Sequence, residues 1–204
     1  MSRPGPEIVL VDYGMGNLRS VARAFERVDA KPRVSRDPDE IRVADRVVVP
    51  GAGAAGDAMR GLQTAGLDEA LTERFAAGHP YLGLCVGLQV LFEHAEEGDA
   101  RCLGAIPGRV ERFPDSLGLA VPHMGWNLLT VEQPHPVLRD GYFYFVHAFR
   151  PVDVPAEHRL GSTEYGEVFP SAVGRDACVA VQFHPEKSQR AGLAMLERFC
   201  AWSP

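Results

Sequence analysis

The sequence predicts an α/β fold with a mixed, largely parallel central sheet, helices on both of its faces and antiparallel strands in the C-terminal half. In the first half, three apolar runs are each followed by a helical pattern, which is typical of parallel strands joined by helices. In the second half, short β-like runs alternate with Gly and Pro turns. No linker or repeat divides the chain, so we expect one domain over residues 1–204.

The first strand–helix unit is expected over residues 7–28. Residues 7–12, Glu-Ile-Val-Leu-Val-Asp, have the composition of a buried strand. Residues 13–17, Tyr-Gly-Met-Gly-Asn, are expected to form the turn that follows. Apolar side chains then recur at helical spacing, at Leu18, Val21, Ala22, Phe25 and Val28.

Two further units follow, and their expected strands are residues 46–50 and 79–84. A helical stretch rich in Ala and Leu follows the first strand and continues to about Ala77. The second strand leads directly into Cys85, from which we expect a helix over residues 86–95. Both strands are mainly apolar, as expected of strands buried on two faces.

The second half is expected to contribute the antiparallel strands. Residues 122–127 are too rich in Pro, Gly and polar groups for a strand interior, so we expect a loop there. An apolar stripe predicts a closing helix from about Ser188 to Trp202. The β-like runs are residues 108–113, 128–131, 142–146 and 177–183.

Composition narrows the classes of function. A formal net charge of -6 and the absence of any Lys/Arg run argue against a nucleic-acid partner and an anionic membrane surface. The longest apolar stretch, residues 81–92, is shorter than the ~18 residues that a membrane span needs, and residues 8–11 are too few for a signal-peptide core. Four scattered cysteines without C-x-x-C spacing indicate reduced thiols and no metal site. We therefore expect a cytoplasmic protein that acts on a small molecule.

Cys85 lies at the centre of Gly83-Leu-Cys-Val-Gly87, between a predicted strand and a predicted helix. This G-x-nucleophile-x-G layout is that of a nucleophile elbow with Cys in place of Ser. The dipole and free N–H groups of a helix N-terminus favour the thiolate, which is the reactive form. A lone buried cysteine is more often structural, but the flanking glycines favour a catalytic interpretation.

His184 is the expected general base, because it ends a predicted strand and such strand ends gather at one edge of a parallel sheet. Pro185 favours an extended conformation at His184. If the chain stays extended across Pro185, Glu186 shares a face with His184 and can orient the imidazole. The three side chains would then form a Cys85-His184-Glu186 triad of nucleophile, base and orienting carboxylate.

An oxyanion hole needs backbone N–H donors near the sulfur. The N–H of Val86 is one candidate, and the loop of Gly51, Ala52 and Gly53 at a neighbouring strand end is the other. Pro-Gly-x-Gly alone is a weak signal, because such sequences form turns in many proteins. The conjunction of three signals, each at a predicted strand end, favours a thiol hydrolase.

These motifs resemble the class I, triad-type glutamine amidotransferases, whose elbow carries G-x-C-x-G-x-Q and whose triad ends in H-P-E. More specific segments resemble, within that family, the glutaminase subunits of imidazole glycerol phosphate synthases. The resemblance runs from the first strand to the last helix and implies the flavodoxin-like amidotransferase fold. The specific segments are residues 11–20 (VDYGMGNLRS), 122–127 (PHMGWN), 144–147 (YFVH) and 183–188 (FHPEKS).

The resemblance implies that Cys85 attacks the carboxamide of L-glutamine, that His184 protonates the departing ammonia, and that water then hydrolyses a γ-glutamyl thioester to glutamate. It also implies that Gln89 helps to hold glutamine, in a pocket that includes His147 and Ala148. Ala148 stands where a hydroxyl residue often occurs in the family, so a hydrogen bond near the pocket is lost. No cofactor and no metal are expected.

The same resemblance implies a heterodimer with a (β/α)₈-barrel cyclase subunit. Ammonia would pass through this barrel for imidazole glycerol phosphate synthesis in histidine biosynthesis. Trp126 in an expected loop is typical of an interface anchor, although it could instead complete the core. The expected interface residues are Asn17, His123, Met124, Gly125, Trp126, Asn127 and Lys187.

Two alternatives stay open at the level of sequence. The chain could be the glutaminase subunit of another amidotransferase or a free-standing γ-glutamyl hydrolase. It could also be a non-catalytic binding subunit that keeps the fold, although the intact Cys85, His184 and Glu186 argue against this.

Overall fold

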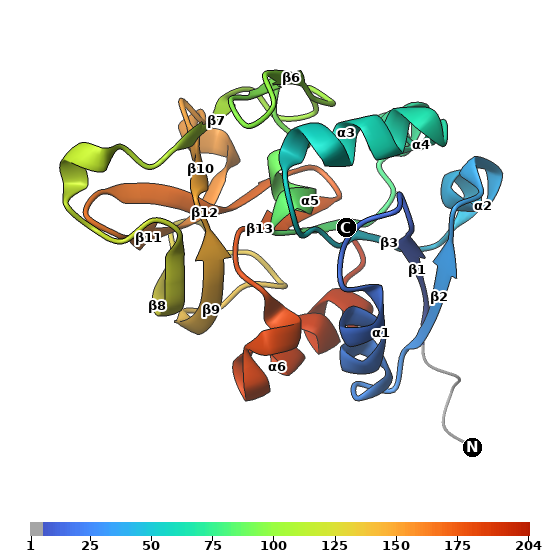
Figure 1. The fold of residues 1–204 in the computed structure, drawn as a ribbon. Coiled ribbons are helices and arrows are strands. Elements are labelled where there is room, and N and C mark those ends of the chain that lie inside the picture. The colour runs from blue at the N-terminus through green and yellow to red at the C-terminus, as the bar shows by residue number, and fades with distance from the viewer. Residues whose placement is uncertain (1–5) are drawn as a thin grey trace.

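The computed structural model describes residues 6–204 (Figure 1), so residues 1–5 of the expected domain lie outside it. The strands are β1 (Glu7–Val11), β2 (Lys31–Ser35), β3 (Val47–Val49), β4 (Tyr81–Leu84), β5 (His94–Ala95), β6 (Ala100–Arg101), β7 (Arg109–Arg112), β8 (His123–Val131), β9 (Gly141–His147), β10 (Phe149–Val152), β11 (Arg159–Glu164), β12 (Val168–Arg175) and β13 (Cys178–Val181). The helices are α1 (Leu18–Glu26), α2 (Pro38–Val43), α3 (Ala55–Thr64), α4 (Leu67–Ala76), α5 (Val86–Gln89) and α6 (Gln189–Ala201), with 3-10 turns η1 (Asp115–Leu117), η2 (Ala156–His158) and η3 (Pro185–Lys187).

Within the described residues, nine strands form one mixed sheet in the order β2-β1-β3-β4-β13-β12-β11-β8-β9. The strands from β2 to β13 in this order pair in parallel. Beyond β13 the pairing is antiparallel. A smaller sheet has the order β10-β7-β5-β6. This arrangement confirms the predicted fold class, and it places the carboxyl ends of β4 and β13 side by side.

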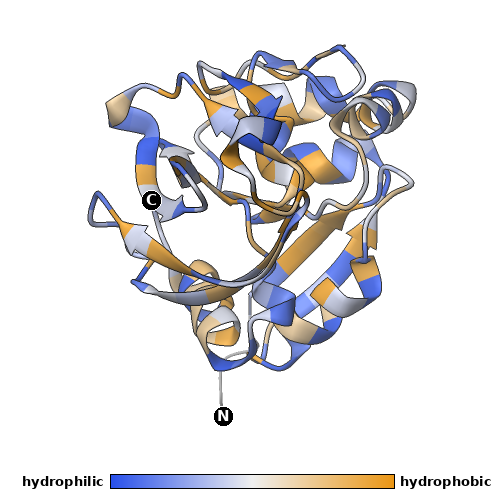
Figure 2. Ribbon diagram, turned by 60° about the vertical axis from the view of Figure 1, so that its left-hand side comes forward, coloured by the Kyte–Doolittle hydropathy of each residue, from blue (hydrophilic) through white to orange (hydrophobic). Residues whose placement is uncertain are grey.

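Helices cover both faces of the parallel part of the large sheet (Figure 1). Alternate side chains of a strand point to opposite faces, and β1 shows this directly. Its Val9 and Val11 belong to the core cluster that includes side chains of α3, α4 and α5, whereas Ile8 and Leu10 belong to the cluster that includes α1 and α6. Figure 2 shows that hydrophobic residues are concentrated in the sheet between these layers. Burial of these two clusters stabilises the sheet and so fixes the position of the strand ends where Cys85 lies.

The helix expected over residues 86–95 is wrong beyond Gln89, where α5 ends. A returning loop supplies the reason. The N–H of Leu103 donates to the carbonyl of Val90 (2.9 Å), and that of Ile106 donates to Leu91 (3.0 Å). These carbonyls therefore accept from the loop instead of from a following helical turn, and the chain enters β5.

Two other expectations for the first half need correction. The helical stretch expected up to Ala77 is two helices, α3 and α4, because Gly66 has a positive φ of 66° that interrupts the helix. Neither β2 nor α2 was predicted from the sequence. β2 is an edge strand whose first four residues are partly or fully exposed, so it lacks an apolar pattern.

The loop expected over residues 122–127 is also wrong, because β8 begins at His123. Residues 123–129 pair only with β9, while β11 pairs with β8 at Thr130 and Val131. A segment that is paired on one side tolerates the polar residues and the positive φ of Gly125 (137°) that argued against a strand interior.

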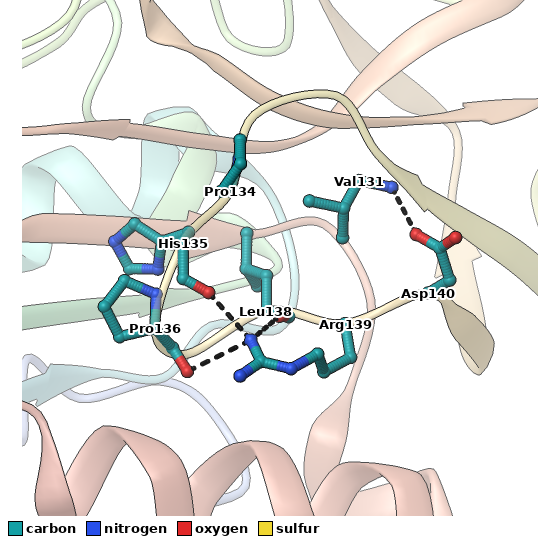
Figure 3. A pocket seen from close by; sticks show the side chains of 7 residues that line it. All are labelled: Val131, Pro134, His135, Pro136, Leu138, Arg139 and Asp140. Atoms are coloured by element: carbon teal, nitrogen blue, oxygen red, sulfur yellow. Dashed lines mark hydrogen bonds between the residues drawn. The ribbon is translucent and has the colours of Figure 1, made fainter.

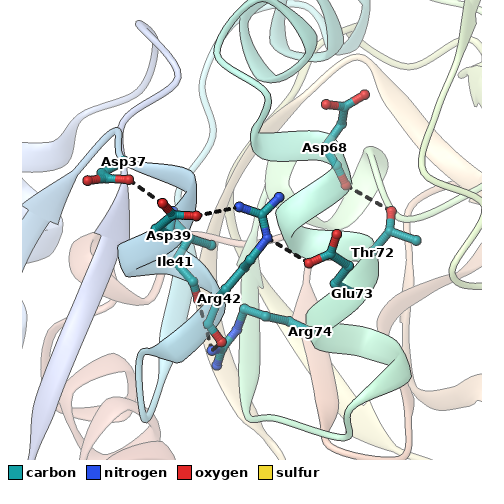
Figure 4. A network of polar contacts seen from close by, with 8 residues as sticks. All are labelled: Asp37, Asp39, Ile41, Arg42, Asp68, Thr72, Glu73 and Arg74. Carbon is teal, nitrogen blue, oxygen red and sulfur yellow. Dashed lines mark hydrogen bonds and ion pairs between the residues drawn. The ribbon is translucent and has the colours of Figure 1, made fainter.

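A buried arginine joins α2 to α4 (Figure 4). The guanidinium of Arg74 donates to the carbonyls of Ile41 (2.9 Å), Arg42 (3.2 Å) and Ala44 (2.6 Å) at the end of α2. It also donates to Pro80 just before β4 (3.2 Å). Burial lowers the pKa of Arg74 to about 10, so the side chain is still charged at neutral pH. Within residues 6–204, no helix combines the length and apolar character needed to cross a membrane.

Candidate active site

Cys85 occupies a strained turn between β4 and α5. Its φ of 53° and ψ of −105° lie in a region that residues with a Cβ rarely adopt. A Cβ on Gly83 would lie 2.4 Å from the carbonyl oxygen of Gly87, and one on Gly87 would lie 2.0 Å from that of Val49. The two glycines are therefore required by close backbone packing, and they permit the sharp turn that presents the sulfur.

His184 and Glu186 meet through a turn. His184 follows β13 in an extended conformation (φ −107°, ψ 94°), whereas Glu186 lies in η3. The expectation that the chain stays extended across Pro185 is therefore wrong. The 3-10 turn brings the carboxylate back, so that Oε1 of Glu186 lies 2.8 Å from Nδ1 of His184. Both side chains are almost fully buried.

The environment of His184 favours its protonated form. Burial by itself lowers the pKa of this imidazole. Hydrogen bonds with Cys85 and Glu186, together with the negative charges of the two partners, outweigh burial and raise the pKa to about 10. At neutral pH the imidazole therefore carries a proton beside the sulfur, ready for delivery to a leaving group.

Ser188 fixes the backbone of His184 to the sheet. The Ser188 hydroxyl donates to the carbonyl of His184 (2.6 Å), and its oxygen accepts from the N–H of Tyr144 in β9 (2.9 Å). The N–H of His184 donates in turn to the carbonyl of Tyr144 (2.9 Å). These three hydrogen bonds hold residues 184–188 against β9 and so fix the position of the His184 imidazole.

A pocket of about 470 Å³ opens beside the sulfur. Gly51, which was expected to form part of the oxyanion hole, is not among its lining residues; it packs against Val86, since a Cβ there would lie 2.4 Å from the Cβ of Val86. The other residues expected to form an oxyanion hole or bind the substrate do line it. The lining consists of Ala52, Gly53, Ala54, Cys85, Val86, Gln89, Glu97, Pro122, Val146, His147, Ala148, Phe149, His184 and Lys187.

Five of the expected interface residues lie on β8, where they divide between its two faces. Met124 and Trp126 point outward, 62% and 47% exposed, beside the outward-facing Tyr144 of β9. Lys187 adjoins this face, with its Nζ 5.9 Å from the Tyr144 ring. His123 is only 3% exposed, so it does not belong to the outward face.

Three of the expected interface residues, His123, Asn127 and Asn17, make contacts within the chain. His123 is stacked between Phe145 and Tyr165, and its Nε2 lies 3.2 Å from the Nδ2 of Asn127. Asn17 is exposed and caps α1, since its side chain accepts from the N–H of Ser20 (3.3 Å). Gly125 lies between the outward-facing residues of β8.

Two polar residues of the site were not predicted from the sequence. Glu97 lines the pocket, and its Oε2 accepts from the N–H of Ala55 at the start of α3 (3.1 Å). No sequence signal marks Glu97, because its position depends on the early end of α5. Gln182 lies against the nucleophile, with Nε2 3.6 Å from Sγ of Cys85. Its signal is its position, immediately after an apolar strand and two residues before His184.

A larger cavity of about 790 Å³ lies near the turn between β8 and β9 (Figure 3). Its charged groups stabilise the turn itself. Arg139 donates to the carbonyls of His135 (3.0 Å) and Pro136 (3.4 Å), and Asp140 accepts from the N–H of Val131 (2.8 Å). No Cys, Ser or Thr of the described residues lines this cavity, so the pocket beside Cys85 remains the candidate active site. Among residues 6–204, no cluster of three His, Cys, Asp or Glu side chains could hold a metal ion.

Comparisons with known proteins agree with this geometry. The profile of the family "Glutamine amidotransferase class-I" matches residues 9–202. The chain is 49% identical to "Imidazole glycerol phosphate synthase subunit HisH" of Thiobacillus denitrificans, over 97% of this chain and 92% of the relative. It is 48% identical to the HisH subunit of Nitrosomonas europaea, over 97% of this chain and 99% of the relative.

Solved structures show the same fold at lower identity. One is described as "Crystal structure of glutamine amidotransferase", with a TM-score of 0.74, 22% identity and coverage of 94% of this chain and 98% of that one. Another is "Structure of PurLQS from Thermotoga maritima", with a TM-score of 0.75, 17% identity and coverage of 97% and 98%. The protein therefore belongs to the class I glutamine amidotransferases and, within them, to the family of imidazole glycerol phosphate synthase HisH subunits.

Proposed function

We propose that this chain is the glutaminase subunit of an imidazole glycerol phosphate synthase. It hydrolyses L-glutamine to glutamate and delivers the ammonia to a (β/α)₈-barrel cyclase subunit, for imidazole glycerol phosphate synthesis in histidine biosynthesis. The observation that carries the proposal is that Cys85 and His184 line one 470 Å³ pocket, with Oε1 of Glu186 2.8 Å from Nδ1 of His184. The names of its relatives support the choice of partner.

In the proposed mechanism, the thiolate of Cys85 attacks the carboxamide carbon of glutamine. His184 donates its proton to the amide nitrogen, the C–N bond breaks, and ammonia leaves behind a γ-glutamyl thioester. His184 then takes a proton from a water molecule that attacks the thioester, which releases glutamate and restores the thiolate. Glu186 accepts the Nδ1–H of His184 throughout and orients the ring.

The negative oxygen of the tetrahedral intermediates requires backbone donors. The first N–H groups of a helix have no partner within the helix, and Val86 supplies such a group one residue after the nucleophile. Ala52 and Gly53 line the same pocket. Gly53 has a φ of 91°, and rotation of its peptide group is the simplest way for this loop to turn an N–H toward the oxyanion.

The pocket also contains groups that suit an amino acid. Glu97 is a carboxylate positioned to pair with the ammonium group of glutamine. Gln89 has its Oε1 buried, with no partner among residues 6–204, so it is free to accept a hydrogen bond from bound substrate. His147 and Ala148 form part of the wall.

The outward face of β8 and β9 is the proposed docking surface for the cyclase. Exposed apolar side chains rarely cluster on a surface that only water contacts, yet Met124, Trp126, Leu128 and Tyr142 are all exposed there. Lys187 joins this face to the pocket, which suits the transfer of ammonia to a docked partner. We also propose that residues 1–204 form one amidotransferase domain that acts in the cytoplasm.

Co-purification with a barrel cyclase, followed by glutaminase assays, tests the proposal. We expect a 1:1 complex whose glutaminase activity rises when the cyclase and its acceptor nucleotide are present. Full activity of the isolated chain, unchanged by the cyclase, would favour a free-standing γ-glutamyl hydrolase. Failure of a glutamine-derived chloroketone to label Cys85 in the complex would favour a non-catalytic subunit.

A further inference from the structure

Gln182 links the nucleophile to the substrate pocket, although the mechanism above does not use it. It directly follows β13, and its side chain is 0% exposed. Its Nε2 donates to Sγ of Cys85 at 3.6 Å, and its Oε1 accepts from Nε2 of Gln89 at 3.3 Å. One buried amide therefore contacts both the attacking atom and a residue that lines the glutamine pocket.

The surroundings fix the position and orientation of this amide. The N–H of Gln182 donates to the carbonyl of Ser171 in β12 (2.8 Å), and the carbonyl of the preceding Val181 accepts from the N–H of Cys85 (2.8 Å). Nε2 of Gln89 also donates to the carbonyl of Phe149 (3.4 Å). Because Gln89 presents an N–H to Gln182, the Gln182 amide must turn its oxygen toward Gln89 and its nitrogen toward the sulfur.

This orientation has two chemical consequences. An N–H aimed at sulfur stabilises a thiolate more than a thiol, because charge-assisted hydrogen bonds are stronger than neutral ones. It also restrains the direction in which the sulfur points. The second contact turns Oε1 of Gln89, which is buried and has no partner among the described residues, away from Gln182.

We propose that Gln182 is a positioning residue for the glutaminase reaction. Its N–H favours the thiolate of Cys85 and holds the sulfur in line for attack, while its carbonyl fixes Gln89 for substrate binding. The substrate half of this inference rests on the proposed function, whereas the thiolate half concerns the free protein. A purely structural Gln182 would affect stability but not the pH at which the thiol becomes reactive.

Two substitutions separate the contacts. Gln182→Met keeps the volume and removes both the donor and the acceptor. Gln182→Glu keeps an acceptor for Gln89 but places a carboxyl group beside the sulfur. Ser171→Ala is the matched control, because it removes a buried hydrogen bond to Thr163 while keeping the carbonyl that holds Gln182.

The first measurement is the rate of Cys85 alkylation by iodoacetamide against pH, in the free chain, with Cys85→Ala as the background. In both Gln182 variants we expect the pH at which alkylation reaches half its maximal rate to rise by about one unit. At pH values below this midpoint, the fraction of thiolate is then about tenfold smaller. The Ser171→Ala profile should match that of the unmodified chain. The second measurement is kcat and KM for glutamine in the complex with the cyclase. Both variants should lose about tenfold in kcat, and only Gln182→Met should also raise KM.

Unchanged alkylation profiles in the Gln182 variants would overturn the inference. If Gln182→Met does not fold by circular dichroism, the isosteric Gln182→Glu carries the same test. Shifted profiles with no glutaminase activity in the unmodified complex would contradict the proposed function while still supporting the thiolate half.

Discussion

At the scale of single residues, the proposed site depends on a proton that the His184 imidazole holds beside the sulfur of Cys85. His184 contacts the sulfur on one side and Glu186 on the other, and these contacts raise its pKa to about 10 despite burial. His147, in the same pocket, shows the opposite behaviour. Burial is the main reason that its pKa falls to about 3. Two imidazoles in one pocket therefore differ in charge at neutral pH, and only His184 can act as a proton donor there.

Glu186→Gln tests the orienting role of the carboxylate. An amide oxygen can still accept from Nδ1 of His184 but brings no charge, so orientation is partly kept. We expect the loss in kcat to be about two orders of magnitude smaller than that caused by Cys85→Ala. Steady-state glutaminase assays on the cyclase complex give the comparison, and equal losses would count against an orienting role.

At the scale of elements, apolar periodicity and strand-end motifs were enough to predict β1, β3, β4, β13 and α6, and hence the sheet edge where the site lies. What failed depends on distant segments. The loop containing Leu103 and Ile106 sets the length of α5. Because α5 ends early, at Gln89, Glu97 can reach the pocket. Gln182 needed the register of β13 against β4 to be known. Sequence periodicity reports on a segment and its buried face, but not on which remote groups accept its hydrogen bonds.

Gly87→Ala tests the requirement for close packing at the elbow. The added Cβ would lie 2.0 Å from the carbonyl oxygen of Val49, so α5 must move away from β3, and we expect a loss of about 3 kcal/mol in the free energy of unfolding. Gly141→Ala is the control, because its Cβ would meet nothing closer than 3.6 Å. Urea unfolding of both variants measures the difference, and similar small losses would argue against the packing requirement.

At the scale of the whole molecule, the pocket lies beside an exposed apolar face, so the proposed active site and the proposed docking surface both involve the strands β8 and β9. The chain order explains how this arises. Cys85 and His184 follow the neighbouring parallel strands β4 and β13, while the antiparallel strand β9 brings Tyr144 and His147 to the same place. The buried histidines of this region also tie stability to pH.

The protein should lose stability on both sides of about pH 6.5. Burial lowers the pKa of His123 to about 4 and that of His147 to about 3. Below pH 6.5 the unfolded chain therefore binds protons that the folded chain excludes. The free energy of unfolding then decreases as the pH is lowered from 6.5 to about 3. The raised pKa of His184 gives stability that is fully present below pH 6.5 and is lost as pH rises through about 10.

Urea midpoints from pH 4 to 10 measure these two limbs. His147→Gln should make the acid limb shallower by up to about 1.4 kcal/mol per pH unit, and His184→Gln should make the alkaline limb shallower. An acid limb that His147→Gln leaves unchanged would contradict this assignment.

Trp126→Ala tests the docking face. Large aromatic side chains dominate binding energy at interfaces, so we expect the affinity for the cyclase to fall about 30-fold, which corresponds to about 2 kcal/mol. Val43→Ala is the control, since Val43 is exposed on α2 at the other end of the large sheet. Titration calorimetry compares the two, and equal affinities would remove this face from the interface.

The most direct test of the account compares two nitrogen sources in the complex of Cys85→Ala with the cyclase. The account predicts that glutamine-dependent imidazole glycerol phosphate synthesis is abolished, because no thioester can form, while synthesis from added ammonium salts continues at the unmodified rate. If both activities fell together, or if glutamine still supported turnover, the assignment of ammonia release to Cys85 would be contradicted.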